Sequence, residues 1–292
     1  MVTPPYAPAR AVPSTDGVTL ALHDLGGDGA PVLMCHPTGF LAATWAPLAA
    51  ELAGHANCWA LDFRGHGDST VPASGDFAWD GMADDVVAVV DALAGSGVDV
   101  VGLRAVGHSM GGTALLMAEQ RRPRTFGGLW LYEPIVSPPS EGGDADRVGS
   151  NPMAEAARRR RPGFPDREAA YANFACKPPL GIVAPAALRA YVDHGLRDRP
   201  DGTVELKCAP EVEAKVFEGS LRQTTFSRLG EVRCPVTVAV SGDAAGPAFL
   251  GPLVADALPH GTLERHPTLT HFGPMEDPAA MAAAVRAALH LG

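Results

Sequence analysis

The stretch Gly107-His108-Ser109-Met110-Gly111-Gly112 decides the fold of this chain. It matches the pattern G-x-S-x-G between an apolar, strand-like run at 103–106 and a helical segment at 113–119. A turn between two such elements must be sharp, so we expect the glycines on either side of the serine to crowd each other. We therefore predict a strained backbone at Ser109, at a helix N-terminus whose free N–H groups favour negative charge.

Similar apolar runs recur along both ends of the chain and alternate with helical segments. Short strands are predicted at 11–14, 19–24, 32–35, 58–61, 103–106, 129–132, 236–240 and 262–265. Helices are predicted at 45–52, 80–94, 113–119, 248–258 and 278–291. This alternation predicts an α/β fold with a mostly parallel, eight-stranded sheet and helices on both of its faces.

The middle of the chain has a different texture. Residues 137–150 are rich in Pro, Gly and Asp, as in an exposed linker, and four helical patches follow at 154–161, 166–174, 185–195 and 210–217. We therefore expect a core made of 1–133 and 231–292, with 134–230 inserted as a mainly helical cap.

Composition excludes several classes of protein. The net charge of −10 over 292 residues disfavours a nucleic-acid partner. We find no apolar stretch of the roughly 18 residues that a membrane span needs, and no apolar leader at the N-terminus. Five cysteines without a C-x-x-C pair predict neither a disulfide framework nor a zinc site, so we expect a cytoplasmic protein.

Together with the serine motif, three other stretches resemble the α/β-hydrolase fold superfamily, on its serine-hydrolase side. His36-Pro37-Thr38-Gly39-Phe40 resembles the family's oxyanion loop, with Pro37 in place of the usual glycine. Asp62-Phe63-Arg64-Gly65-His66-Gly67-Asp68-Ser69 resembles its D-x-R-G-x-G-x-S loop, and 270–278 resembles its catalytic-histidine segment. The resemblance implies an esterase- or lipase-like enzyme with a helical cap and Ser109 as nucleophile.

A serine nucleophile needs a general base, and three histidines near the C-terminus are candidates. His260 precedes the last predicted strand and would face away from the carboxyl ends of the strands, whereas His266 lies at the end of that strand. His271 follows in the loop before the final helix, inside the segment that resembles the family, and we predict it as the base.

The acid that orients the base has two candidates. In most of the family the acid follows the strand predicted at 236–240, but there the expected position holds Ala245, and Asp243 comes two residues early. The alternative is Glu133, at the end of the preceding strand, where certain relatives carry their acid. Because pairing with His271 would offset the cost of burying a carboxylate there, we favour Glu133 and keep Asp243 as the alternative.

These assignments predict hydrolysis of a small ester, lactone or thioester through an acyl-enzyme on Ser109. Backbone N–H groups of Met110 and of Thr38 or Gly39 would hold the oxyanion, with no metal and no organic cofactor. The alternatives are C–C bond hydrolysis of a diketone-like substrate and a ligand-binding receptor with a slow triad. A serine in place of an aspartate nucleophile argues against dehalogenase or epoxide-hydrolase chemistry.

Four consecutive arginines in the predicted cap stay open to two interpretations. The run spans more than one helical turn, so its side chains cannot share one face. It is either a solvated helix flank or a patch that recruits an anionic substrate; the residues are Arg158, Arg159, Arg160 and Arg161.

Overall fold

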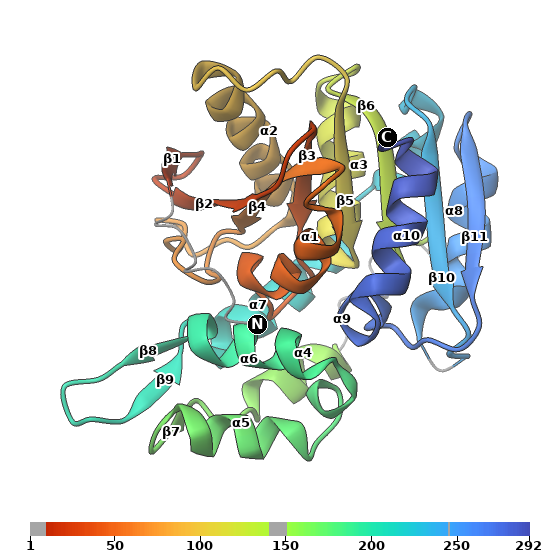
Figure 1. Ribbon diagram of the computed structural model, residues 1–292. Helices are drawn as coiled ribbons and strands as arrows, with labels where there is room; N and C mark the ends of the chain where they lie inside the picture. Colours follow the sequence, from red (N-terminus) through yellow and green to blue (C-terminus); the bar gives the residue numbers. More distant parts are fainter. Residues whose placement is uncertain (1–9, 140–150, 245) are drawn as a thin grey trace.

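The computed structural model describes residues 10–139, 151–244 and 246–292, and an eight-stranded sheet runs through it (Figure 1). In spatial order its strands are β1 (Arg10–Pro13), β2 (Thr19–Gly26), β4 (Ala56–Asp62), β3 (Ala30–Cys35), β5 (Leu103–His108), β6 (Phe126–Tyr132), β10 (Val236–Ser241) and β11 (Gly261–His266). β2 is antiparallel to both β1 and β4, and all other neighbours are parallel. The predicted α/β fold is thus confirmed.

Helices cover both faces of this sheet (Figure 1). They are α1 (Ala46–Leu52) and α10 (Pro278–Leu289) on one face, and α2 (Trp79–Gly95), α3 (Met110–Arg121) and α8 (Leu250–Ala257) on the other. Successive side chains of a strand point to opposite faces, so Val32 and Met34 join the core under α1 and α10, whereas Leu33 and Cys35 join the core under α2 and α3. This explains why the central strands read as continuous apolar runs.

The carboxyl ends of the parallel strands meet at one edge of the sheet, and the candidate site residues follow directly after them. Ser109 comes after β5 and Glu133 after β6. The ladder of backbone bonds continues past both strands: Ser109 N–H donates to Tyr132 O at 2.9 Å, and Glu133 N–H donates to Ala239 O at 2.9 Å. Both residues therefore leave the sheet from a fixed position at the same edge.

Elements from the middle of the chain lie together beyond this edge, in the lower part of Figure 1. They are the helices α4 (Pro152–Arg158), α5 (Arg167–Ala175), α6 (Pro185–Gly195) and α7 (Pro210–Gly219), and a small antiparallel sheet of β7 (Gly163–Phe164), β9 (Val204–Leu206) and β8 (Leu196–Asp198). Each of the four predicted helical patches contains a helix, although α4 ends at Arg158 and not at 161 as predicted. The small sheet was not predicted, because strands of two or three residues are too short to show alternation.

Polar contacts tie these middle elements, the predicted cap, to the rest of the molecule. The cap residue Ala184 donates its N–H to Met275 O at 2.8 Å. Val216 O of the cap accepts from Trp79 Nε1 at 2.8 Å. Lys207 Nζ of the cap lies 2.6 Å from Asp68 Oδ1. The division of the chain at 134 and 230 stays a prediction, and most of the predicted linker, 140–150, lies outside the described residues. Within the described ranges, no helix is long and apolar enough to cross a membrane.

Gly107 and Gly111 allow the turn at Ser109 to pack tightly. We predicted from the sequence that these two glycines crowd each other, but each of them packs against a different neighbour. A Cβ added at Gly107 would lie 2.6 Å from Gly112 Cα. A Cβ added at Gly111 would lie only 2.1 Å from the carbonyl oxygen of Cys35, on β3. The start of α3 therefore rests on backbone atoms of the neighbouring strand, which no side chain can displace cheaply.

We predict that Gly111→Ala lowers the free energy of unfolding by about 1–3 kcal/mol, because the added methyl group overpacks two rigid backbone segments. Gly95→Ala is the matched control, because nothing lies within 4 Å of its added Cβ at the end of α2. It should leave stability unchanged or raise it by up to about 1 kcal/mol. Urea denaturation measures both, and equal midpoints for Gly111→Ala and the wild type would contradict this packing argument.

Candidate active site

Ser109 sits in the strained strand-to-helix turn predicted from the sequence. Its φ of 54° and ψ of −118° lie in a region that non-glycine residues rarely occupy. The neighbouring segments hold it there, since its N–H is bonded to Tyr132 and its carbonyl accepts the Thr113 N–H at 3.1 Å. It caps α3, and the first N–H groups of a helix have no acceptor within the helix. An anion forming at this serine would therefore meet unpaired donors.

Glu133 is almost completely buried at the end of β6, and two donors reach its carboxylate. Oε1 accepts the Ser241 N–H at 2.7 Å, and Oε2 lies 2.6 Å from Nδ1 of His271. Burial alone would raise the pKa of Glu133, but the hydrogen bonds from His271 and Ser241 outweigh it and place the pKa below its ordinary value. The carboxylate therefore remains charged and accepts the proton that His271 carries on Nδ1.

His271 belongs to the segment between β11 and α9 (Gly273–Glu276), a short helix absent from the sequence prediction. Tyr132 Oη donates to Thr270 O at 2.8 Å and anchors the segment to β6. The His271 ring packs against that of His108, which precedes Ser109, with 4.8 Å between centroids. With Nδ1 engaged by Glu133, Nε2 of His271 is the nitrogen left to act as a base, and the ring is only 19% exposed.

The other candidates for base and acid lie elsewhere. Nε2 of His266 is bonded to Glu264 at 2.6 Å, and His260 is exposed just before β11. Asp243 is half-buried after β10, and its N–H donates to Ser241 Oγ at 3.1 Å. Ala245 lies outside the described residues. Of the two predicted acids, the structure brings Glu133 to the Nδ1 atom of His271.

Of the three candidate oxyanion donors, Met110 is the first residue of α3, whereas Thr38 and Gly39 lie in a turn at 37–40, which we call the Thr38 turn. Phe40 N–H donates to Pro37 O at 3.2 Å, and Gly39 takes a positive φ of 79°, as the third residue of a type II turn does. Gly39 N–H already donates to Nε2 of His66 at 3.1 Å. Within the described ranges no acceptor is bonded to Thr38 N–H, so it is the available donor of the two.

Two histidines behind this turn are completely buried and uncharged. Burial lowers the pKa of His36 to about 4 and that of His66 to about 3. Each ring donates from Nδ1 to a carbonyl, His36 to Pro37 at 2.9 Å and His66 to Arg64 at 3.1 Å. Both histidines lie in segments that resemble the family in sequence, but the resemblance did not predict either of these hydrogen bonds.

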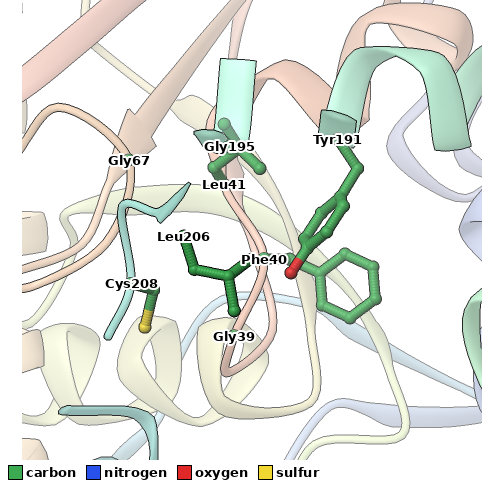
Figure 2. Close-up of a pocket in the computed structure, with 8 residues that line it drawn as sticks. All are labelled: Gly39, Phe40, Leu41, Gly67, Tyr191, Gly195, Leu206 and Cys208. Atoms are coloured by element: carbon green, nitrogen blue, oxygen red, sulfur yellow. The ribbon is translucent and has the colours of Figure 1, made fainter. Parts of the chain in front are cut away.

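The predicted cap contacts the Thr38 turn on its outer side. Arg160 pairs with Glu213 and donates to Tyr191 Oη at 2.7 Å, and a Cβ at Gly39 would lie 2.6 Å from Glu213 Oε1. Figure 2 shows Tyr191 beside Phe40 in a cavity next to Gly39. The cavity holds about one water molecule.

The four arginines at 158–161 form neither a single solvated helix flank nor a single patch for an anionic substrate, because their side chains have different environments. Arg158 ends α4 and pairs with Glu211 at 2.9 Å and Glu218 at 2.8 Å, whereas Arg160 turns inward to Glu213. Arg161 donates to Gly163 O at 2.8 Å, and Arg159 is exposed. Sequence spacing could not predict the inward turn of Arg160, because the helix ends before it.

One cluster in the described ranges has the spacing of a metal site: His23, Asp62 and Asp68. Its atoms already have partners in the protein. His23 Nε2 lies 3.0 Å from Asp62 Oδ2, which also accepts the Asp68 N–H at 2.9 Å, and the Asp68 carboxylate pairs with Lys207. These bonds within the protein explain why the three side chains lie close together, without a metal ion.

We predict that acid weakens the folded state partly through the buried His66. Its pKa is about 3 when folded against an ordinary 6.5, so below 6.5 the unfolded chain binds the extra proton and stability falls as pH falls. His66→Gln removes this group, so its slope of unfolding free energy against pH should be lower by up to about 1.4 kcal/mol per pH unit. Urea titrations between about pH 5 and 6 measure the slope, and identical slopes for variant and wild type would contradict the prediction.

Comparison with known proteins places these features in a family. A model of the alpha/beta hydrolase family matches residues 32–284. Protein phosphatase methylesterase 1 of Mus musculus is 38% identical over 96 residues, which are 32% of this chain and 24% of that protein. 2-Hydroxymuconate semialdehyde hydrolase of Pseudomonas sp. (strain CF600) is 34% identical over 148 residues, 49% of this chain and 50% of that protein.

These matches span about a quarter to a half of each curated relative. The solved structure of a thermophilic esterase from Thermogutta terrifontis, with malate bound, superposes with a TM-score of 0.72 at 25% identity, over 97% of this chain and 98% of that one. The family model spans most of the chain and includes the turns at Thr38, Ser109 and Glu133 and the His271 segment. The chain therefore belongs to the alpha/beta hydrolase family.

Proposed function

We propose that this chain is a serine hydrolase that cleaves a carboxylic ester, lactone or thioester of a small molecule. The proposal rests above all on the 2.6 Å contact between His271 Nδ1 and Glu133 Oε2, formed at the sheet edge that also carries the strained Ser109. A carboxylate, an imidazole and a serine are the three members of the Ser-His-acid triad, which catalyses acyl transfer.

The roles follow from the chemistry of each group. Nε2 of His271 removes the proton of Ser109 Oγ while Oγ attacks the carbonyl carbon, and Glu133 stabilises the resulting imidazolium. N–H groups of Met110 and Thr38 donate to the oxyanion. When the intermediate collapses, the bond to the leaving group breaks and His271 returns the proton to it; water activated by His271 then hydrolyses the acyl-enzyme.

A second candidate is hydrolysis of a C–C bond next to a carbonyl. The specific observation in its favour is the similarity to 2-hydroxymuconate semialdehyde hydrolase, which spans about half of each chain. The same nucleophile, base and oxyanion donors serve this reaction, with a carbanion as the leaving group. A receptor with a slow triad is the remaining alternative, and it predicts ligand binding without turnover.

We predict that a fluorophosphonate probe labels the wild-type protein on Ser109 and that Ser109→Ala abolishes labelling. The His271–Glu133 pair raises the nucleophilicity of this serine, whereas exposed serines do not react. Labelling followed by peptide mass spectrometry identifies the residue. Equal labelling of Ser109→Ala and wild type would refute the serine-hydrolase assignment.

A substrate panel separates the candidate reactions. It contains esters of increasing acyl length, lactones, thioesters and vinylogous diketones, each tested with wild type and Ser109→Ala. Turnover confined to the diketones would replace the ester assignment by C–C hydrolysis. Binding without Ser109-dependent turnover of any member would favour the receptor.

We predict that Glu133→Gln lowers kcat by roughly 10³–10⁴, because the amide no longer accepts the Nδ1 proton and the base adopts the wrong tautomer. Gln retains an oxygen for the Ser241 N–H, so the fold should persist. Asp243→Asn is the matched control and should change kcat by less than about threefold. The reverse ranking of the two variants would move the acid to Asp243.

A further inference from the structure

Two loops of the core exchange hydrogen bonds through histidines in a reciprocal way. His36, before the Thr38 turn, accepts the N–H of Phe63 at 3.0 Å through Nε2. His66, three residues after Phe63, accepts the N–H of Gly39 at 3.1 Å through Nε2. We call these two residues the histidine clasp; their ring centroids lie 5.1 Å apart.

The partners of each ring determine where its proton lies. An N–H group can only donate and a carbonyl can only accept, so Nε2 must be unprotonated and Nδ1 must carry the hydrogen in both residues. A protonated ring would direct a second N–H at the backbone N–H that it now accepts. The clasp therefore holds only while both imidazoles are neutral, and their complete burial maintains that state.

A third bond extends the connection to the end of the Thr38 segment. Asp62 Oδ1 accepts the Ala42 N–H at 2.7 Å, so 36–42 is attached to 62–66 at both ends and in the middle. Of these three bonds, only the one from the Gly39 N–H to His66 Nε2 is made by a residue of the Thr38 turn. Since Gly39 donates to His66, the turn presents its other N–H, that of Thr38.

We propose that His66 is a positioning residue of this active site: by accepting the Gly39 N–H it fixes the orientation of the Thr38 turn and so aims the Thr38 N–H at the oxyanion. This inference rests on the proposed serine-hydrolase function. His66 does not touch the substrate, and its effect on the reaction passes through the turn.

Contacts on the opposite side of Gly39 explain why this bond matters. Glu213, paired with Arg160, leaves no room for even a Cβ at Gly39, so the turn lies between the cap and His66. The His66 bond supports the turn from the core side, opposite the contact with Glu213.

Kinetics of His66→Ala and His66→Gln test the proposal on an ester for which the wild type shows Ser109-dependent turnover. His66→Ala should lower kcat by about 10²-fold, close to the loss of one oxyanion donor, with KM within about threefold of wild type. Gln Oε1 can accept the Gly39 N–H, so His66→Gln should recover at least about tenfold in kcat. His260→Ala, at an exposed histidine, is the matched control and should behave as wild type.

The outcomes distinguish this inference from the proposed function. Absence of Ser109-dependent turnover in the wild type overturns both. Normal wild-type turnover with a His66→Ala kcat within about threefold of it overturns the positioning role alone. Equal losses in His66→Ala and His66→Gln, or losses that appear only in KM, also overturn it.

A spectroscopic measurement on the wild-type protein covers the case in which His66→Ala does not fold. Long-range ¹⁵N–¹H NMR near neutral pH should show Nδ1 of His66 protonated and Nε2 unprotonated. Coupling from the Gly39 amide to Nε2 across the hydrogen bond should be visible. A proton on Nε2 of His66 overturns the proposal.

Discussion

A carboxylate buried at the end of a strand needs partners, and Glu133 finds them in two segments more than a hundred residues away. An unpaired charge in that position would cost several kcal/mol, so the N–H of Ser241 and the ring of His271 have to be in place when the chain folds. Because Ser109 N–H is bonded to the preceding Tyr132, the serine turn is tied to the same strand end. One buried charge therefore organises the ends of β6 and β10 and the His271 segment.

The Thr38 turn depends on a second set of constraints. The loop that follows β4 holds it from inside through the histidine clasp, and Glu213 of the predicted cap closes over it from outside. Gly39 is needed twice, for its positive φ and for its missing side chain. The two supports differ in kind: the inner one is a network of buried hydrogen bonds, whereas the outer one is the Arg160–Glu213 pair of the predicted cap.

Local sequence predicted the elements of the core well, since each strand and helix there has its own pattern. The apolar run of β5, the glycines at 107 and 111 and the helical start of α3 predicted the turn at Ser109. Sequence predicted less well where a structure depends on contacts between distant segments. The small sheet of β7, β8 and β9 has strands too short to show a period, and Gly111 is small because it rests on Cys35 rather than on Gly107.

The sequence by itself determined the α/β alternation, the strained serine turn and the short set of histidines and acids that could accompany it, because these depend on residue type and spacing along the chain. Only the tertiary structure decided which of them meet. It brought Glu133 to Nδ1 of His271, occupied the Gly39 N–H with His66, and turned Arg160 inward to Glu213. The reason is physical: a hydrogen bond of about 3 Å depends on how distant segments pack, and spacing along one chain does not encode that distance.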